Sequence, residues 1–208
     1  NDEVLDTDSS INDGNISKHN DVKGQIEFKH VSFKYPDSEE YMLEDISFKA
    51  KKGDTVAFIG STGSGKSTLI NLVPRFYDVT SGEILIDDIN VKDYNLKTLH
   101  EKIGYVPQKA VIFNDSIMNN ILYGDAGKKL TKEMGIEASK IAQADDFITK
   151  MEKEYNSHIA SGGTNVSGGQ KQRISIARAI ARKPEFYIFD DSFSALDYKT
   201  DYILRKAL

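Results

Sequence analysis

The chain has 208 residues, enough to bury one sizeable hydrophobic core. Its 39% hydrophobic and 28% charged residues are typical of an ordinary globular domain, and no apolar run approaches the roughly 18 residues needed to cross a bilayer. A net charge of -5 lacks the basic footprint of a nucleic-acid-binding protein, and the absence of cysteine excludes disulfides and thiolate chemistry.

Residues 1–23 are rich in acidic, serine, asparagine and glycine residues. Such a segment offers little apolar surface to bury, so we predict a disordered linker. The chain opens with Asn1 and closes on residues 202–208, which have the pattern of an interrupted helix. We therefore expect a piece of a longer protein.

From Gly24 onward, short strand-like runs alternate with helical patterns. Residues 55–59 and 186–189 are continuously apolar, which is typical of strands buried on both faces of a parallel sheet. Helical periodicity is visible in 133–151 and 170–182. These patterns predict an α/β core with a helical insertion. The predicted strands are 25–33, 42–48, 55–59, 82–87, 103–106 and 186–190.

A glycine-rich stretch, GSTGSGKST, lies between a predicted strand and a helical pattern and matches G-x-x-x-x-G-K-[ST]. In such a loop, backbone amides wrap around phosphates, the lysine brings a charge to the terminal phosphates, and the serine hydroxyl binds Mg²⁺. A glycine-rich turn with an incidental lysine is the alternative, and the strand-then-helix context favours the phosphate loop. The candidate residues are Gly60, Ser61, Thr62, Gly63, Ser64, Gly65, Lys66, Ser67 and Thr68.

Two carboxylates, Asp190 and Asp191, end the apolar strand at 186–190. A phosphate loop needs an acidic residue across the sheet to hold magnesium, and Asp190 has that position. A solvated aspartate at a strand end is the simpler interpretation of either residue alone. The presence of Lys66 and Ser67 in the same chain favours a magnesium role for Asp190.

The stretch VSGGQ, residues 166–170, precedes the predicted helix 171–182. Unpaired amides at a helix N-terminus, together with a serine hydroxyl, can form a second anion site. Taken alone, Ser-Gly-Gly could equally be a flexible hinge.

Taken together, these motifs and their order resemble the nucleotide-binding domain of ATP-binding cassette (ABC) transporters of the exporter type. The resemblance covers residues 24–208 and rests on Tyr35, GSTGSGKST, Gln108 in YVPQ, VSGGQ and FDD. The stretches at 75–78 and 113–124 add the exporter character. The resemblance implies a P-loop NTPase core, mostly parallel sheet flanked by helices. It also implies an N-terminal antiparallel β part, a helical subdomain at about 109–182, and a linker at 1–23 that follows a membrane domain.

In this family, two nucleotide-binding domains pack head to tail and hold ATP and Mg²⁺ between them. The resemblance implies that residues 60–68 hold ATP from one side, while Ser167, Gly168, Gly169 and Gln170 serve the nucleotide of the partner. Ser67, Gln108 and Asp190 would reach the magnesium ion, and Lys66, Gln108 and Asp191 would carry the catalysis. Tyr35 would stack on adenine. The simpler alternatives are a core aromatic for Tyr35 and a polar loop residue for Gln108.

Asp191 stands where active family members carry the glutamate that polarises the attacking water. Its side chain is one methylene shorter, and a misplacement of roughly 1 Å can slow a reaction on the order of a hundredfold. We therefore predict the weak-site subunit of a heterodimeric exporter, at the cytoplasmic face of the membrane. Its partners would be a second, non-identical nucleotide-binding domain and the transmembrane domains, with no nucleic acid.

Several features depart from the family pattern or favour other functions. The family's switch histidine lies beyond the Ser-Ala-Leu-Asp segment, where this sequence has no histidine. Residues 159–163, just before VSGGQ, lack the glutamate that is usual in the exporter crossing loop. A non-hydrolysing, ATP-dependent dimerisation module and a soluble ABC ATPase unconnected with transport are the alternatives. A GTPase is disfavoured because Asn90-Val91-Lys92-Asp93 has the wrong order for a guanine-binding motif.

Overall fold

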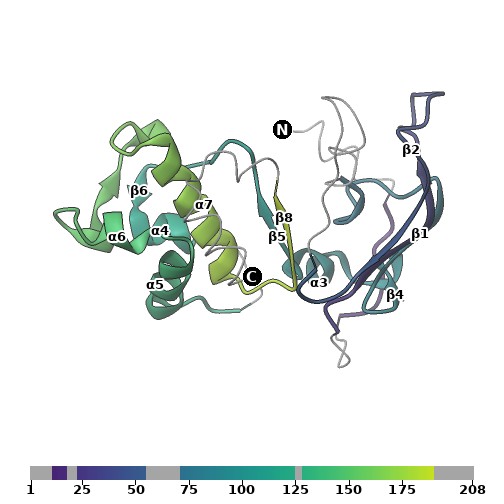
Figure 1. Ribbon diagram of the computed structural model, residues 1–208, viewed down its shortest axis with the longest axis horizontal. Helices are drawn as coiled ribbons and strands as arrows, with labels where there is room; N and C mark the ends of the chain where they lie inside the picture. Colours follow the sequence, from purple (N-terminus) through teal and green to yellow (C-terminus); the bar gives the residue numbers. More distant parts are fainter. Residues whose placement is uncertain (1–10, 18–22, 55–70, 125–127, 190–208) are drawn as a thin grey trace. The chain divides into compact units, whose positions relative to one another are not determined.

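The structure is a computed structural model that describes residues 11–17, 23–54, 71–124 and 128–189 (Figure 1). The chain divides into two compact units, Asn1–His100 and Glu101–Leu208. The predicted strand at 55–59 lies outside the described residues. Among the helices that are described, none has both the length and the apolar character of a membrane-spanning segment.

A twisted antiparallel sheet organises the N-terminal unit, with strand order β2-β1-β3-β4. The central strand, β1, pairs antiparallel with β2 on one side and β3 on the other, and Figure 1 shows the long β1–β2 pair. The predicted strands at 25–33, 42–48 and 82–87 are confirmed to within two residues. The observed strands are β1 (Ile26–Phe33), β2 (Leu43–Ala50), β3 (Ser81–Ile86) and β4 (Ile89–Asn90).

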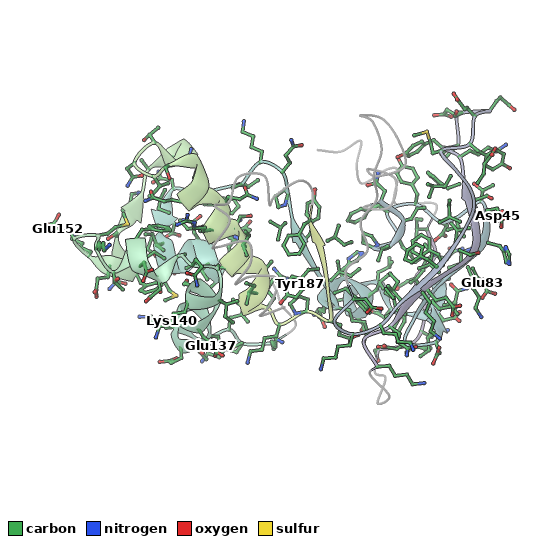
Figure 2. The ribbon with its side chains drawn as sticks, in the orientation of Figure 1. Asp45, Glu83, Glu137, Lys140, Glu152 and Tyr187 are labelled. Carbon is green, nitrogen blue, oxygen red and sulfur yellow. The ribbon has the colours of Figure 1, made fainter. Side chains whose placement is uncertain are left out.

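Alternation along β1 and β2 places one apolar face in the core, whereas Ile84, Leu85 and Ile86 of β3 are all buried. Phe28, Phe33 and Ile84 are each only 1% exposed, and the ring of Phe28 stacks on that of Phe48 at 4.5 Å. The opposite face is polar, and Figure 2 shows Asp45 and Glu83 pointing away from the core. The alternation of buried and exposed residues is visible along β1 and β2.

The β1 strand is interrupted by a bulge at His30, where the register shifts. His30 has φ 48° and the facing Asp45 has φ 49°, and their side chains pair at 2.7 Å. Gly82 approaches this bulge so closely that a Cβ atom there would lie 2.2 Å from the His30 carbonyl oxygen. A glycine is therefore required at this point of β3.

Two short helical elements, η1 (Val91–Asp93) and α3 (Leu96–Glu101), follow the sheet. Residues 11–17, which belong to the segment predicted as a disordered linker, run alongside them, and Ile16 forms a parallel β-bridge with Tyr94. Tyr94 is completely buried and its hydroxyl donates to the carbonyl oxygen of Ile86 at 2.9 Å. This part of the chain is thus held against the N-terminal unit.

The C-terminal unit combines a parallel strand pair with helices. β5 pairs in parallel with β8, in agreement with the predicted strands at 103–106 and 186–190, although Asp190 itself lies outside the described residues. α7 packs against α4 and α5. Glu137 and Lys140 are on the exposed face of α5 (Figure 2). The elements are β5 (Ile103–Val106), β6 (Asp115–Ser116), α4 (Ile117–Ile121), α5 (Lys132–Ile141), α6 (Asp145–Ile148), η2 (Glu154–Asn156), β7 (His158–Ile159), η3 (Ser161–Gly163), α7 (Gly168–Ala181) and β8 (Phe186–Phe189).

The helical pattern at 133–151 corresponds to two helices, α5 and α6, because the chain breaks after α5. Gln143 takes the left-handed conformation with φ 60°. The Gln143 amide donates to the carbonyl oxygen of Lys140 at 3.2 Å, and the Ala144 amide donates to that of Ser139 at 2.7 Å. These two bonds form a Schellman motif, which ends a helix. The usual signal, a glycine at the left-handed position, is replaced here by glutamine.

Asn120 is a fully buried polar side chain at the centre of the C-terminal unit. Its Oδ1 accepts from the Phe113 amide at 2.8 Å, and its Nδ2 donates to the carbonyl oxygens of Phe113 and Ser116, each at 3.0 Å. The Nη2 of Arg178 also donates to Oδ1, at 3.3 Å. One amide thus holds the loop before α4 and links it to α7.

We expect Asn120→Ala to destabilise the chain by about 2–4 kcal/mol, because it leaves several buried main-chain groups without their partner. Urea unfolding followed by circular dichroism measures the change. Asn119→Ala is the matched control, since Asn119 is exposed and its amide bonds only to the exposed Asp115 side chain at 2.8 Å in the described contacts. Equal stability losses in the two variants would contradict the role assigned to Asn120.

Candidate functional site

The sequence-predicted site residues fall into three groups. Residues 60–68, Asp190 and Asp191 lie outside the described residues. Tyr35 belongs to the N-terminal unit. Gln108 and residues 167–170 belong to the C-terminal unit, where α7 connects them through its own side chains.

Tyr35 follows the end of β1 and is half-buried. Its ring makes edge-on contacts with Phe33 at 4.8 Å and with Tyr77 at 5.1 Å. The Nδ2 of Asn71 donates to its hydroxyl at 3.4 Å. These contacts fix the orientation of a ring that remains partly accessible, which is what an aromatic stacking platform requires.

Gln108 is exposed and lies two residues beyond the end of β5. Val106, the last residue of β5, pairs with Phe189, the last residue of β8, so the carboxyl ends of both strands meet at one edge. Ligand sites in parallel sheets form at such edges. In the sequence, Asp190 is the residue that follows Phe189.

The loop that bears Gln108 is held by α7 on both sides. The buried Gln172 donates through Nε2 to the carbonyl oxygen of Pro107 at 3.2 Å. Arg178 donates through Nη1 to the carbonyl oxygen of Val111 at 2.7 Å and through Nε to that of Asn120 at 2.7 Å. The loop between Pro107 and Val111 is therefore fastened to one helix at both ends.

The guanidinium of Arg178 lies over two aromatic rings, Phe113 at 5.3 Å and Tyr123 at 5.8 Å. Burial lowers the pKa of Arg178 below its ordinary value. An arginine stays charged in proteins nonetheless, and its contacts with carbonyl oxygens and ring faces stabilise the cation.

Ser167 caps the N-terminus of α7. Its Oγ accepts from the Gln170 amide at 3.1 Å, and the Oε1 of Gln170 accepts from the Ser167 amide at 3.0 Å. This reciprocal pair is a capping box. Within the described part of the chain, the Ser167 hydroxyl proton has no acceptor, and the amides of Gly168 and Gly169 lie in the first turn, which has no intrahelical partners. A Cβ atom at Gly168 would meet nothing within 4 Å, so there is open space beside this turn.

The donor groups fit a magnesium–nucleotide complex as far as they are described. Mg²⁺ prefers oxygen ligands, and the Gln108 amide supplies one. Among residues 11–17, 23–54, 71–124 and 128–189, no group of three or more His, Asp or Glu side chains could hold a metal ion.

Sequence reasoning missed the residues that support the site: Asn71, Asn120, Gln172 and Arg178. Gln172 could not be identified from the sequence, because only the structure shows that its position on α7 is buried. The same holds for Asn71. Its partner Tyr35 is distant in the chain, so only the fold brings them together.

Comparison with known proteins supplies the family. The sequence model described as ABC transporter matches residues 43–194. Proteins of Staphylococcus aureus strains NCTC 8325 and COL, which carry the name multidrug export ATP-binding/permease protein, are 45% identical over 207 residues. The match covers 99% of this chain and 36% of each relative, so the chain spans about a third of their length.

A solved structure of a bacterial Atm1-family ABC exporter with ATP bound has a TM-score of 0.78 and 34% identity to this chain. The likeness covers 92% of this chain and 33% of that one. The predicted fold class is confirmed, including the N-terminal antiparallel β part. The chain belongs to the ABC transporter family and has the P-loop NTPase fold of its nucleotide-binding domain.

Proposed function

We propose that this chain is the ATP-binding module of an ABC exporter and that it binds ATP together with Mg²⁺. The observation that carries the proposal is the order of the nucleotide motifs along a chain that matches export ATP-binding proteins over 99% of its length. The proposed domain is 24–208, with a helical subdomain at about 109–182. Residues 1–23 would connect it to a membrane domain.

In the proposed site, residues 60–68 wrap the phosphates, and Lys66 neutralises the terminal ones. Ser67, Gln108 and Asp190 would hold a magnesium ion through oxygen ligands, and the bound ion would supply positive charge opposite the phosphates. Tyr35 stacks on the adenine ring. The edge-on contacts of Tyr35 with Phe33 and Tyr77 support this role, because they fix the ring before nucleotide arrives.

The proposed partner is a second, non-identical nucleotide-binding domain, packed head to tail at the cytoplasmic face of the membrane. Ser167, Gly168, Gly169 and Gln170 would then contact the ATP of that partner. The capping box supports this assignment, because it fixes Ser167 at the N-terminus of α7, where the amides of the first turn favour an anion.

At the chain's own site we propose weak hydrolysis, because the carboxylate of Asp191 is one methylene shorter than the glutamate of active family members. Binding should be little affected, since residues 60–68 and Asp190 retain the family pattern. A non-hydrolysing module, in which ATP serves only to join two subunits, is the second candidate, and Asp191 is the observation that favours it. ATP-dependent dimerisation without any phosphate release would support that candidate.

A soluble ABC ATPase remains the alternative to an exporter module. Co-purification decides between them, because an exporter module should be recovered with transmembrane domains from detergent-solubilised membranes. Recovery of the native protein without any membrane partner would contradict the exporter assignment.

Lys66→Ala should weaken MgATP binding by about tenfold to a hundredfold, because the phosphates lose a charge-assisted hydrogen bond. Isothermal titration calorimetry measures the dissociation constant. Lys29→Ala is the matched control, since Lys29 is exposed on β1 and its loss changes the net charge equally. Unchanged affinity in Lys66→Ala would overturn the ATP-binding proposal.

Tyr35→Leu should weaken MgATP binding by about tenfold or more, because stacking of a base on an aromatic ring contributes about 1–3 kcal/mol. Tyr35→Phe keeps the ring and should bind within about threefold of the unmodified chain, since the lost hydroxyl contact with Asn71 is long. Magnesium triphosphate without a base is the second control. If its affinity also falls in Tyr35→Leu, the residue acts on the fold rather than on adenine.

Asp191→Glu should speed hydrolysis at this site on the order of a hundredfold, because the longer side chain brings the carboxylate to the attacking water. Phosphate release is measured in dimers whose partner domain carries glutamine in place of its own catalytic glutamate. Only this chain's site can then react. Asp191→Asn is the matched control and should stay slow. If the unmodified chain released phosphate as fast as Asp191→Glu, the weak-site proposal would be wrong.

A further inference from the structure

Residues 12–17, here called the latch, are docked on the N-terminal unit by main-chain bonds. The amides of Asn15 and Ile16 both donate to the carbonyl oxygen of Asp93, at 3.0 and 2.9 Å. The Asn95 amide returns a bond to the carbonyl oxygen of Ile16 at 2.8 Å. Residues 15 and 16 of the latch therefore pair with residues 93–95 in the manner of a short β-strand.

The side chain of Asp13 fastens the latch to the start of α3. One carboxylate oxygen accepts from the Leu96 amide at 2.7 Å and the other from Asn95 Nδ2 at 3.3 Å. A carboxylate at the first turn of a helix is favoured by the unpaired amides there. At the other end of the latch, the Thr98 hydroxyl donates to the carbonyl oxygen of Ser17 at 3.3 Å.

Gly14 is the closest point of contact. A Cβ atom at this position would lie 2.4 Å from the carbonyl oxygen of Tyr94 and 2.5 Å from that of Lys92. Both neighbours are main-chain atoms, which cannot rotate away as a flexible side chain can. Any larger residue at position 14 must therefore lift the latch from its seat.

Arg75 joins the latch to a turn at 71–78. Its side chain is almost fully buried, and its Nη1 donates to the carbonyl oxygen of Asn12 at 2.9 Å. Nε and Nη2 form a two-pronged ion pair with Asp78 at 2.7 and 3.0 Å. The backbone of Arg75 is left-handed, with φ 59°. The left-handed backbone of Arg75 and its two-pronged pair with Asp78 fix the position of the guanidinium. The carbonyl oxygen of Asn12 reaches the guanidinium only when the latch is docked.

The same turn positions Tyr35. The carbonyl oxygen of Asn71 accepts from the amides of Phe76 and Tyr77, at 2.9 and 3.3 Å, while its side chain reaches the Tyr35 hydroxyl. The Tyr77 ring packs edge-on against the Tyr35 ring. One turn thus binds the latch through Arg75 and the adenine-stacking ring through Asn71 and Tyr77.

We propose that docking of the latch and adenine binding at Tyr35 are energetically coupled through this turn. The inference rests on the proposed function, because it assigns a regulator to the same nucleotide site. Coupling between two sites is reciprocal, so a docked latch raises ATP affinity and bound ATP holds the latch down. A membrane segment that pulled on residues 1–23 would then weaken ATP binding without touching the phosphate loop.

Gly14→Val tests the coupling by undocking the latch. MgATP affinity should fall about tenfold, within the range usual for coupled sites. Asn12→Ala is the matched control, because Arg75 binds the main-chain oxygen of Asn12 and that oxygen remains. The control should bind as the unmodified chain does. Equal affinity in Gly14→Val and Asn12→Ala would overturn the proposal.

Hydrogen exchange gives the reciprocal measurement on the unmodified chain. Saturating MgATP should slow exchange of the Asn15 and Ile16 amides several-fold, and magnesium triphosphate without a base should not. In Tyr35→Leu, saturating MgATP should not slow the exchange of either amide. No slowing by MgATP in the unmodified chain would overturn the coupling, even if Gly14→Val failed to fold. If the unmodified chain did not bind MgATP at all, the proposed function itself would be overturned.

Discussion

The bonds from Arg178 to main-chain carbonyl oxygens are the constraint on which the C-terminal unit depends. A buried guanidinium is costly unless its donors are satisfied. Here Val111 and Asn120 provide carbonyl oxygens at 2.7 Å, and the rings of Phe113 and Tyr123 cover the cation. The charge is stabilised only when α7, α4 and the loop at 107–113 are all in place, so the three segments form one cooperative piece.

This constraint has a consequence for the nucleotide site. Gln172 and Arg178 fasten both ends of the Gln108 loop to α7, and Ser167 is the N-cap of that helix. In the proposed dimer, Gln108 faces the chain's own magnesium while Ser167 faces the partner's ATP. A displacement of the loop at one site would therefore move the helix tip at the other. A site that hydrolyses ATP poorly could still affect its neighbour through this connection.

The sequence predicted the elements whose signals are local. Short strand-like runs marked β1, β2 and β3, and the apolar run before Asp190 marked β8. Ser167 with Gln170 three residues later has the pattern of the capping box that the structure contains. The break after α5 was not predictable in this way, because the left-handed residue is Gln143 and its conformation is set by tertiary packing around buried Ser139 and Ala144.

The same limit explains why the contacts of residues 11–17 were not anticipated. Composition describes what a segment can bury, and this one buries little. Its docking instead depends on main-chain groups, and composition says nothing about these. Two arginines, one in each unit, act in this way: Arg75 binds the carbonyl oxygen of Asn12, and Arg178 binds that of Val111. When an arginine binds a main-chain carbonyl oxygen, the contact does not depend on the side chain of the residue that carries this oxygen. Polar or variable loops can therefore be held at fixed points, and in this chain the Gln108 loop and the latch are both of that kind.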